Sequence, residues 1–305
     1  MSGNWRAHRE RGNRVSLWLI RFLALRLGRN TTRLLLYPIT LYYLVTAHDH
    51  RRASRVYLSR VLERPAGWLD VARHIHCFAS TILDRVYFLA GRMDQFELRF
   101  TGLESLEVYL GARRGCLLVG AHLGSFEALR ALGVRLQELP LKVLMYREHN
   151  AVITGLLGDL NADIADTVIP LGRIDAMLQV RDALDAGQMV GVLGDRLGES
   201  DKAVDCEFLG LPTRMPAGPG LLVAATGAPA LMCLALYRGA NRYDIHLEAL
   251  PGLGTVSRRD RSSAVAAWTR HYAARLEAHA RDAPWNWFNF YDYWTEDAPG
   301  PKAIT

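Results

Sequence analysis

A histidine and a glutamate near the middle of the chain have the residue types and spacing of a proton-transfer pair. Residues 116–127 read Cys-Leu-Leu-Val-Gly-Ala-His-Leu-Gly-Ser-Phe-Glu, so four residues separate His122 from Glu127. The apolar run before Gly120 predicts a buried strand, and Ser125 is a suitable cap for a following helix. His122 is then expected in the strand-to-helix loop, with Glu127 in the first helical turn. A carboxylate that holds one imidazole nitrogen fixes the tautomer and makes the other nitrogen a stronger base.

This pair is suited to taking a proton from a hydroxyl or an amine that attacks an acyl group, so the motif favours acyl transfer. A histidine five residues before a glutamate is also common by chance, and most such histidines are surface or satisfied core residues. The position of His122 between Gly120 and Gly124, at the end of an apolar strand, favours the catalytic interpretation. Binding loops of α/β folds lie at such positions.

The remaining sequence alternates strand and helix patterns. Strands are expected at residues 96–100, 116–119, 142–146, 167–170, 188–194, 230–237 and 242–250, and helices at 68–92, 125–138, 150–163, 174–186, 217–227 and 262–282. This alternation predicts an α/β fold with a mixed, mostly parallel central sheet flanked by helices. Arg147 and Asp195, like His122, come at or just after the end of an expected strand, where such sheets place their sites.

Positive charge is concentrated at the N-terminus. The 305 residues carry a formal net charge of +6, whereas residues 1–64 hold thirteen arginines, no lysine and three acidic residues, a net charge of +10. A slightly acidic body therefore follows a strongly basic head, and basic heads bind nucleic acid or anionic membrane surfaces. No recognition motif accompanies the arginines, so nucleic acid is not an expected partner.

Large apolar residues accompany these arginines in the stretches 15–27 and 34–45. Neither stretch is a clean run of about twenty residues that would span a bilayer. Five arginines fall on one face of a helix through this region: Arg14, Arg21, Arg26, Arg29 and Arg33. The pattern predicts an amphipathic, hydrophobic membrane anchor over residues 1–64, with arginines at the lipid headgroups, followed by the main domain at 65–305. The alternative is a helical hairpin packed on the main body.

Motifs of other enzyme classes are missing from the sequence. Ser125 does not lie in a Gly-x-Ser-x-Gly elbow, and neither His-Glu-x-x-His zinc spacing nor a Gly-rich phosphate loop with Lys-Ser/Thr occurs. The four cysteines are scattered without Cys-x-x-Cys spacing, which is typical of small buried side chains in a reducing compartment. We therefore expect no metal and no cofactor.

The chain resembles the late acyltransferases of bacterial lipid A biosynthesis, within the glycerolipid acyltransferase superfamily that carries a His-x4-Asp/Glu motif. Besides that motif, the resemblance covers most of the chain in the same order. It follows the basic apolar N-terminus, the residues 146–150, 192–196, 208–219 and 225–229, and a tryptophan-rich C-terminal segment.

The sequence departs from that family pattern at three places. The lipid A enzymes usually have Asn-Trp where this chain has Ser125-Phe126, and Asp-Gln where it has Asp195-Arg196. Residues 285–294 are more similar to acyltransferase relatives associated with aryl polyene or related pigment-lipid pathways. The implied chemistry is the same in both groups, whereas the acceptor stays open.

The resemblance implies roles for the motif residues. His122 would be the general base and Glu127 its orienting partner. Backbone N–H groups around Gly124 and Ser125 would donate to the oxyanion that forms on the thioester carbonyl.

Residues beyond the motif would bind substrate. Arg147, with Asn150 nearby, would hold an anionic group of the acceptor or of the donor's phosphopantetheine. Asp195 and Arg196 would shape the site as an ion pair, although a purely structural pair fits the sequence equally well. The aromatic run 285–294 fits an interfacial belt, the wall of an acyl tunnel or simple core packing.

The resemblance also implies partners and a location. A fatty or polyene acyl chain would pass from an acyl carrier protein, favoured over coenzyme A, to a hydroxyl or an amine of a lipid A-type lipid or related glycolipid. Arg51, Arg52 and Arg55 would attract the acidic carrier. The enzyme would act on anionic lipid at the cytoplasmic face of the inner membrane. The alternative is a non-catalytic, membrane-associated lipid-binding or assembly protein that keeps the fold, against which the His122–Glu127 pair argues.

Overall fold

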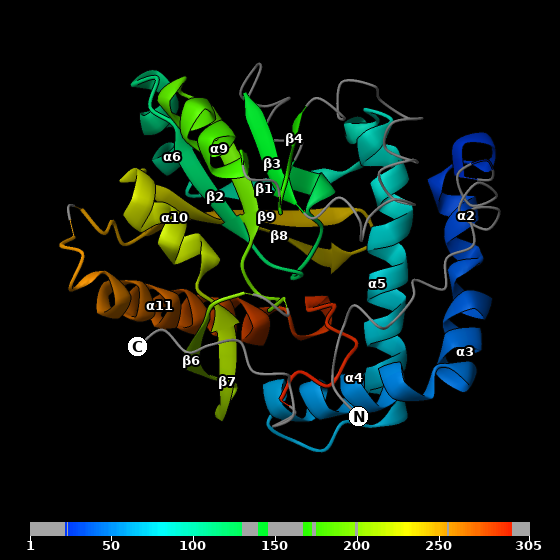
Figure 1. Ribbon diagram of the computed structural model, residues 1–305. Helices are drawn as coiled ribbons and strands as arrows, with labels where there is room; N and C mark the ends of the chain where they lie inside the picture. Colours follow the sequence, from blue (N-terminus) through cyan, green and yellow to red (C-terminus); the bar gives the residue numbers. More distant parts are fainter. Residues whose placement is uncertain are drawn as a thin grey trace.

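A seven-stranded sheet with strand order β1-β9-β8-β2-β5-β3-β4 forms the centre of the protein (Figure 1). The computed structural model describes residues 22, 24–129, 140–145, 167–172, 175–198, 201–254 and 256–294. The strands are β1 (Glu97–Thr101), β2 (Cys116–Gly120), β3 (Leu141–Met145), β4 (Val168–Pro170), β5 (Met189–Leu193), β8 (Ala230–Gly239) and β9 (Arg242–Leu250). Neighbouring strands run parallel except β8 and β9. The predicted α/β fold with a mostly parallel sheet is confirmed.

Helices cover both faces of this sheet because its strands are apolar on both sides. Alternate residues of β2 face opposite ways: Leu117 and Val119 belong to one core cluster, Cys116 and Leu118 to the other. The first cluster is covered by α9 (Ala176–Asp185), α10 (Gly218–Thr226) and α11 (Arg261–Asp282), and the second mainly by α5 (Trp68–Leu89) and α6 (Leu103–Gly111). The 3-10 turns are η2 (Met93–Gln95), η3 (Glu127–Leu129) and η5 (Pro284–Asn286).

A two-stranded hairpin, which the sequence did not predict, packs beside α11. It consists of β6 (Ala203–Phe208) and β7 (Leu211–Pro216), paired antiparallel. Most predicted elements agree with the observed ones within a few residues. The predicted helix 150–163 and most of the predicted helix 125–138 lie outside the described residues.

Three helices precede α5, namely α2 (Arg29–Leu34), α3 (Leu36–Thr46) and α4 (His48–Val61). The helix α3 runs along α5 on the side away from the sheet (Figure 1). The helix α4 contributes Tyr57 and Leu58 to the same core cluster as the sheet. The described part of residues 1–64 therefore shares its core with the rest of the protein.

Two arginines of the predicted lipid-facing set are committed to protein partners. Arg29 forms a buried ion pair with Asp84 of α5, with Nε 2.7 Å from Oδ1, and Arg33 donates to the Tyr237 hydroxyl at 2.9 Å. A buried carboxylate such as that of Asp84 needs a cation beside it. The prediction that Arg29 contacts lipid headgroups is therefore wrong, because this side chain is buried, whereas Arg33 is half-buried and its contact with lipid stays a prediction. Arg14 and Arg21 lie outside the described residues.

No helix in the described part of the chain is both long enough and apolar enough to cross a membrane. The membrane anchor predicted within residues 1–64 stays a prediction.

Candidate active site

Two neighbouring parallel strands bring His122 and Asp195 together. Strand β2 pairs with β5 so that Gly120 lies opposite Leu193, and His122 and Asp195 each follow two residues later. The ladder continues one step, because the N–H of Gly194 donates to the carbonyl of Gly120 at 2.9 Å. The two side chains therefore leave the same carboxyl edge of the sheet at the same level.

The carboxylate of Asp195 orients the imidazole of His122. Oδ1 lies 2.8 Å from Nδ1, and Oδ2 accepts the backbone N–H of His122 at 3.1 Å. An ionised carboxylate only accepts hydrogen bonds, so Nδ1 carries the proton and Nε2 keeps its lone pair. Among the described residues, none hydrogen-bonds to Nε2, and the side chain is 27% exposed. This nitrogen is therefore available to a substrate.

Asp195 is itself held by the C-terminal segment, which we define as residues 284–294. Besides His122, the indole N–H of Trp287 and the amide of Asn289 donate to Oδ2, at 3.2 and 2.9 Å. Burial alone would raise the pKa of Asp195, but His122, Arg196 and Asn289 bring it down to about 2. The carboxylate therefore stays charged throughout the physiological pH range.

The pKa of His122 lies below its ordinary value of 6.5. Burial is the largest cause, the positive charge of Arg196 adds to it, and the negative charge of Asp195 acts in the opposite direction. The imidazole is accordingly neutral at pH 7, which is the form that accepts a proton.

Backbone hydrogen bonds tie the C-terminal segment to the histidine loop, which we define as residues 121–126 between β2 and η3. The N–H of Phe288 donates to the carbonyl of His122 at 2.8 Å, and the N–H of Gly124 donates to the carbonyl of Asn286 at 2.9 Å. Arg196 adds two contacts, to Oδ1 of Asn289 at 2.7 Å and to the carbonyl of Phe288 at 3.1 Å. The segment thus positions both members of the pair.

A buried histidine on α5 fixes the C-terminal segment from behind. Nε2 of His74 lies 2.9 Å from the carbonyl of Trp287, and Nδ1 lies 2.8 Å from the hydroxyl of Ser54. The carbonyl can only accept, so Nε2 carries the proton and Ser54 donates to Nδ1. Burial lowers the pKa of His74 to about 4, which keeps this arrangement neutral and intact at pH 7.

Trp287, Asn289 and His74 were not identified as site residues from the sequence. A signal was present, because Asn286 and Asn289 interrupt an aromatic run. Both are buried, at 4% and 1% exposure, and a buried amide requires hydrogen-bond partners. The aromatic run itself is core packing around the site: Trp287 is fully buried against Tyr57 and Phe208.

The carboxylate of Glu127 contacts an arginine. Its Oε1 lies 2.8 Å from Nε of Arg85 on α5. The carboxylate that holds His122 comes from Asp195, so the predicted role of Glu127 as orienting partner is not what these contacts show. The chain passes from Gly124 into the turn η3, and this path brings Glu127 next to α5.

The two predicted oxyanion donors are already engaged. The N–H of Gly124 bonds to Asn286, and the N–H of Ser125 donates to the carbonyl of Ala235 at 2.8 Å. A side chain on Gly124 would place Cβ only 2.0 Å from that carbonyl oxygen, at a φ of +83°. Gly124 and Ser125 therefore attach the loop to β8, and their N–H groups are not available to a substrate.

The remaining predicted substrate-binding residues divide into two groups. Arg147 and Asn150 lie outside the described residues. Arg196 lies at the site and acts on the pKa of both His122 and Asp195, as well as binding the C-terminal segment.

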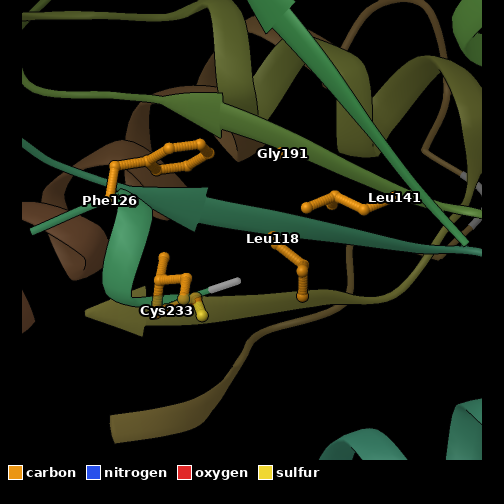
Figure 2. A pocket seen from close by; sticks show the side chains of 7 residues that line it. Leu118, Phe126, Leu141, Gly191 and Cys233 are labelled. Atoms are coloured by element: carbon orange, nitrogen blue, oxygen red, sulfur yellow. The ribbon is translucent and has the colours of Figure 1, made fainter. Parts of the chain in front are cut away.

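A small apolar cavity lies next to the histidine loop. Figure 2 shows Leu118, Phe126, Leu141 and Cys233 around it, on the strands β2, β3 and β8 and on the loop. Gly120, Leu129 and Gly191 also line it, and a Cβ on Gly191 would approach the Phe126 ring to 3.4 Å. The enclosed volume is about 10 Å³, which is room for about one water molecule.

The site therefore combines an imidazole and a buried carboxylate at the carboxyl edge of a mostly parallel α/β sheet. The family model described as bacterial lipid A biosynthesis acyltransferase matches residues 73–296, and the chain belongs to this family. The matched range includes His122, Asp195 and Asn289. The resemblance found in the sequence is thereby confirmed, and a search of curated proteins found no match.

We predict that Asp195→Asn lowers the acyl-transfer rate about 10²- to 10⁴-fold, because the imidazole loses the group that sets its tautomer. In the wild type, the acid limb of the pH–rate profile should lie below pH 6.5, since the pKa of His122 is lowered. The negative charge of Asp195 raises that pKa, so the variant's acid limb should move to still lower pH.

Rates measured between pH 4 and 8 test both statements. Asp205→Asn is the matched control, because that side chain is 81% exposed on β6. An Asp195→Asn protein with the wild-type rate and an unmoved acid limb would show that Asp195 sets neither the tautomer nor the pKa of His122.

Proposed function

We propose that the protein transfers a fatty or polyene acyl chain from a carrier thioester to a hydroxyl or an amine of a lipid acceptor, with His122 as the general base. The contact between Nδ1 of His122 and Asp195, at 2.8 Å, carries the proposal. It leaves Nε2 unprotonated in a neutral imidazole. Membership of the acyltransferase family supports transfer to a lipid acceptor.

In the proposed reaction, Nε2 of His122 takes the proton of the acceptor group as its oxygen or nitrogen attacks the thioester carbonyl. The imidazolium that forms is stabilised by the Asp195 carboxylate, which stays ionised. When the tetrahedral intermediate collapses, the carbon–sulfur bond breaks and the imidazolium returns its proton to the departing sulfur. The acyl group is then an ester or an amide, and the histidine is neutral again.

For the donor we favour an acyl carrier protein. Arg52 and Arg55 are exposed on α4 and would attract an acidic carrier. Arg51 belongs less clearly to this docking surface, because it caps α3 by donating to the carbonyls of Leu44 and Val45, the second at 2.9 Å.

The acceptor in this proposal is a lipid A-type lipid or a related glycolipid, reached at the cytoplasmic face of the inner membrane. Support for a membrane surface comes from α2 and α3, where Leu34, Leu41 and Val45 are 65%, 60% and 61% exposed. Two further apolar residues, Trp68 and Leu69, are exposed in the first turn of α5, which packs against α3. Exposed apolar side chains on adjacent helices support a surface that binds lipid or protein.

A non-catalytic lipid-binding protein with this fold is the alternative. The contact by which Asp195 fixes the tautomer of His122 argues against this alternative. Binding lipid does not require a base with a free Nε2. A turnover measurement separates the two functions.

We predict that His122→Ala lowers acyl transfer about 10²- to 10⁴-fold, the usual contribution of a positioned general base. The measurement is lipid mass spectrometry of a deletion strain complemented with the wild type or the variant. The lipid species that loses one acyl group in the deletion strain identifies the acceptor. His271→Ala, on α11, is the control. Full acylation by a folded His122→Ala protein would contradict the mechanism.

We also predict that Leu41→Gln combined with Val45→Gln lowers binding to anionic lipid vesicles by at least about tenfold, because two exposed apolar side chains no longer enter the lipid. Vesicle flotation measures the bound fraction. Leu178→Gln is the matched control, since Leu178 is 64% exposed on α9. Equal flotation of the double variant and the wild type would place the lipid-binding surface elsewhere.

A further inference from the structure

Arg85 is a cation next to the catalytic histidine that the proposed reaction does not use. It projects from α5 toward the histidine loop, with Nε 2.8 Å from Oε1 of Glu127. Its positive charge is one of the causes that lower the pKa of His122, so it lies within electrostatic reach of the imidazole.

Among the described residues, Arg85 uses little of its hydrogen-bonding capacity. Nε is buried and makes no aligned hydrogen bond, even to the nearby Glu127 oxygen. Within the described part of the chain, this guanidinium pairs with Glu127. Because an arginine carries five N–H donors, the Arg85 side chain can take a second anion while it keeps its contact with Glu127. The side chain is 26% exposed and can therefore be reached.

Glu127 is suited to hold this arginine in place. The residue is 9% exposed, so its carboxylate has lost most of its contact with water. A buried carboxylate is stabilised by an adjacent cation, and the pairing in turn limits the orientations of the Arg85 guanidinium. Glu127 thus orients the guanidinium of Arg85. Asp195, in contrast, contacts the imidazole of His122 directly.

We propose that Arg85 binds a phosphate ester of a substrate and that Glu127 positions the guanidinium for this contact. The planar fork of an arginine matches phosphate oxygens with two parallel hydrogen bonds. This inference rests on the proposed function, because both of its substrate classes carry such a group. The phosphopantetheine of a thioester donor is one source, and the headgroup of a lipid acceptor is the other.

The test compares each phosphorylated probe with its phosphate-free counterpart by calorimetric titration of the full chain at low salt. Phosphopantetheine against pantetheine represents the donor, and dihexanoyl phosphatidic acid against dihexanoylglycerol represents the acceptor. We expect the wild type to bind one phosphorylated probe about tenfold more tightly than its counterpart.

Four variants test whether the preference for a phosphorylated probe depends on Arg85 and Glu127. Arg85→Met should abolish it, Arg85→Lys should keep part of it, and Glu127→Gln should weaken it. Because Arg85→Met leaves Glu127 without a cation, the double variant Arg85→Met with Glu127→Gln serves as the version without an unpaired charge. Arg99→Met is the matched control, since Arg99 pairs with Glu97 on the exposed face of β1.

A preference for phosphopantetheine identifies the donor as the source of the phosphate, and a preference for phosphatidic acid identifies the acceptor. No preference for either probe, or a preference that survives in the double variant, would overturn the proposal. These titrations need no turnover. A protein that fails to transfer acyl groups but shows the preference would contradict the proposed function alone, and an active enzyme without the preference would contradict this inference alone.

Discussion

The buried carboxylate of Asp195 is the group on which the site depends. A charge removed from water at the end of β5 is stable only when hydrogen-bond donors surround it. Four N–H groups of described residues do so: the backbone and Nδ1 of His122, the indole of Trp287 and the amide of Asn289. The need to satisfy this carboxylate therefore fixes the tautomer of His122 and draws the C-terminal segment across the end of the sheet.

Close backbone contacts hold the surrounding loop in one conformation. At Gly124 the chain approaches the carbonyl of Ala235 so closely that no Cβ fits, and the positive φ there also favours glycine. The same stretch is fixed from the other side by Asn286, whose amide pairs with both the N–H and the carbonyl of Tyr237. A rigid loop suits the proposed role of His122 as a general base, because proton transfer needs the donor and acceptor atoms within hydrogen-bond reach.

The positions of the site residues along the strands could be predicted from the sequence, whereas their contacts could not. The apolar runs ending at Gly120 and Leu193 place His122 and Asp195 just after strands, and this prediction agrees with β2 and β5. That the two strands are neighbours is a property of the sheet order, which no local pattern contains. Glu127 was the obvious partner because it is near in sequence.

Long-range partners and an unusual turn explain the other features of the structure that the sequence did not predict. Trp287 and Asn289 are 92 and 94 residues from Asp195, a separation that periodicity does not bridge. The β6–β7 hairpin turns at Leu209 and Gly210, both with positive φ. Leucine is an unusual residue for the first of these positions, which glycine, asparagine or aspartate normally takes, so the turn was not recognisable.

The central claim is that Asp195 holds His122 with the proton on Nδ1 and a free Nε2. Nitrogen-15 NMR of the histidine side chains tests it most directly, with the His122 signals assigned by their loss in His122→Gln. At pH 7 we predict a neutral ring protonated on Nδ1, and a change in its tautomer equilibrium in Asp195→Asn. A wild-type ring protonated on Nε2, or a spectrum unchanged by Asp195→Asn, would contradict the account.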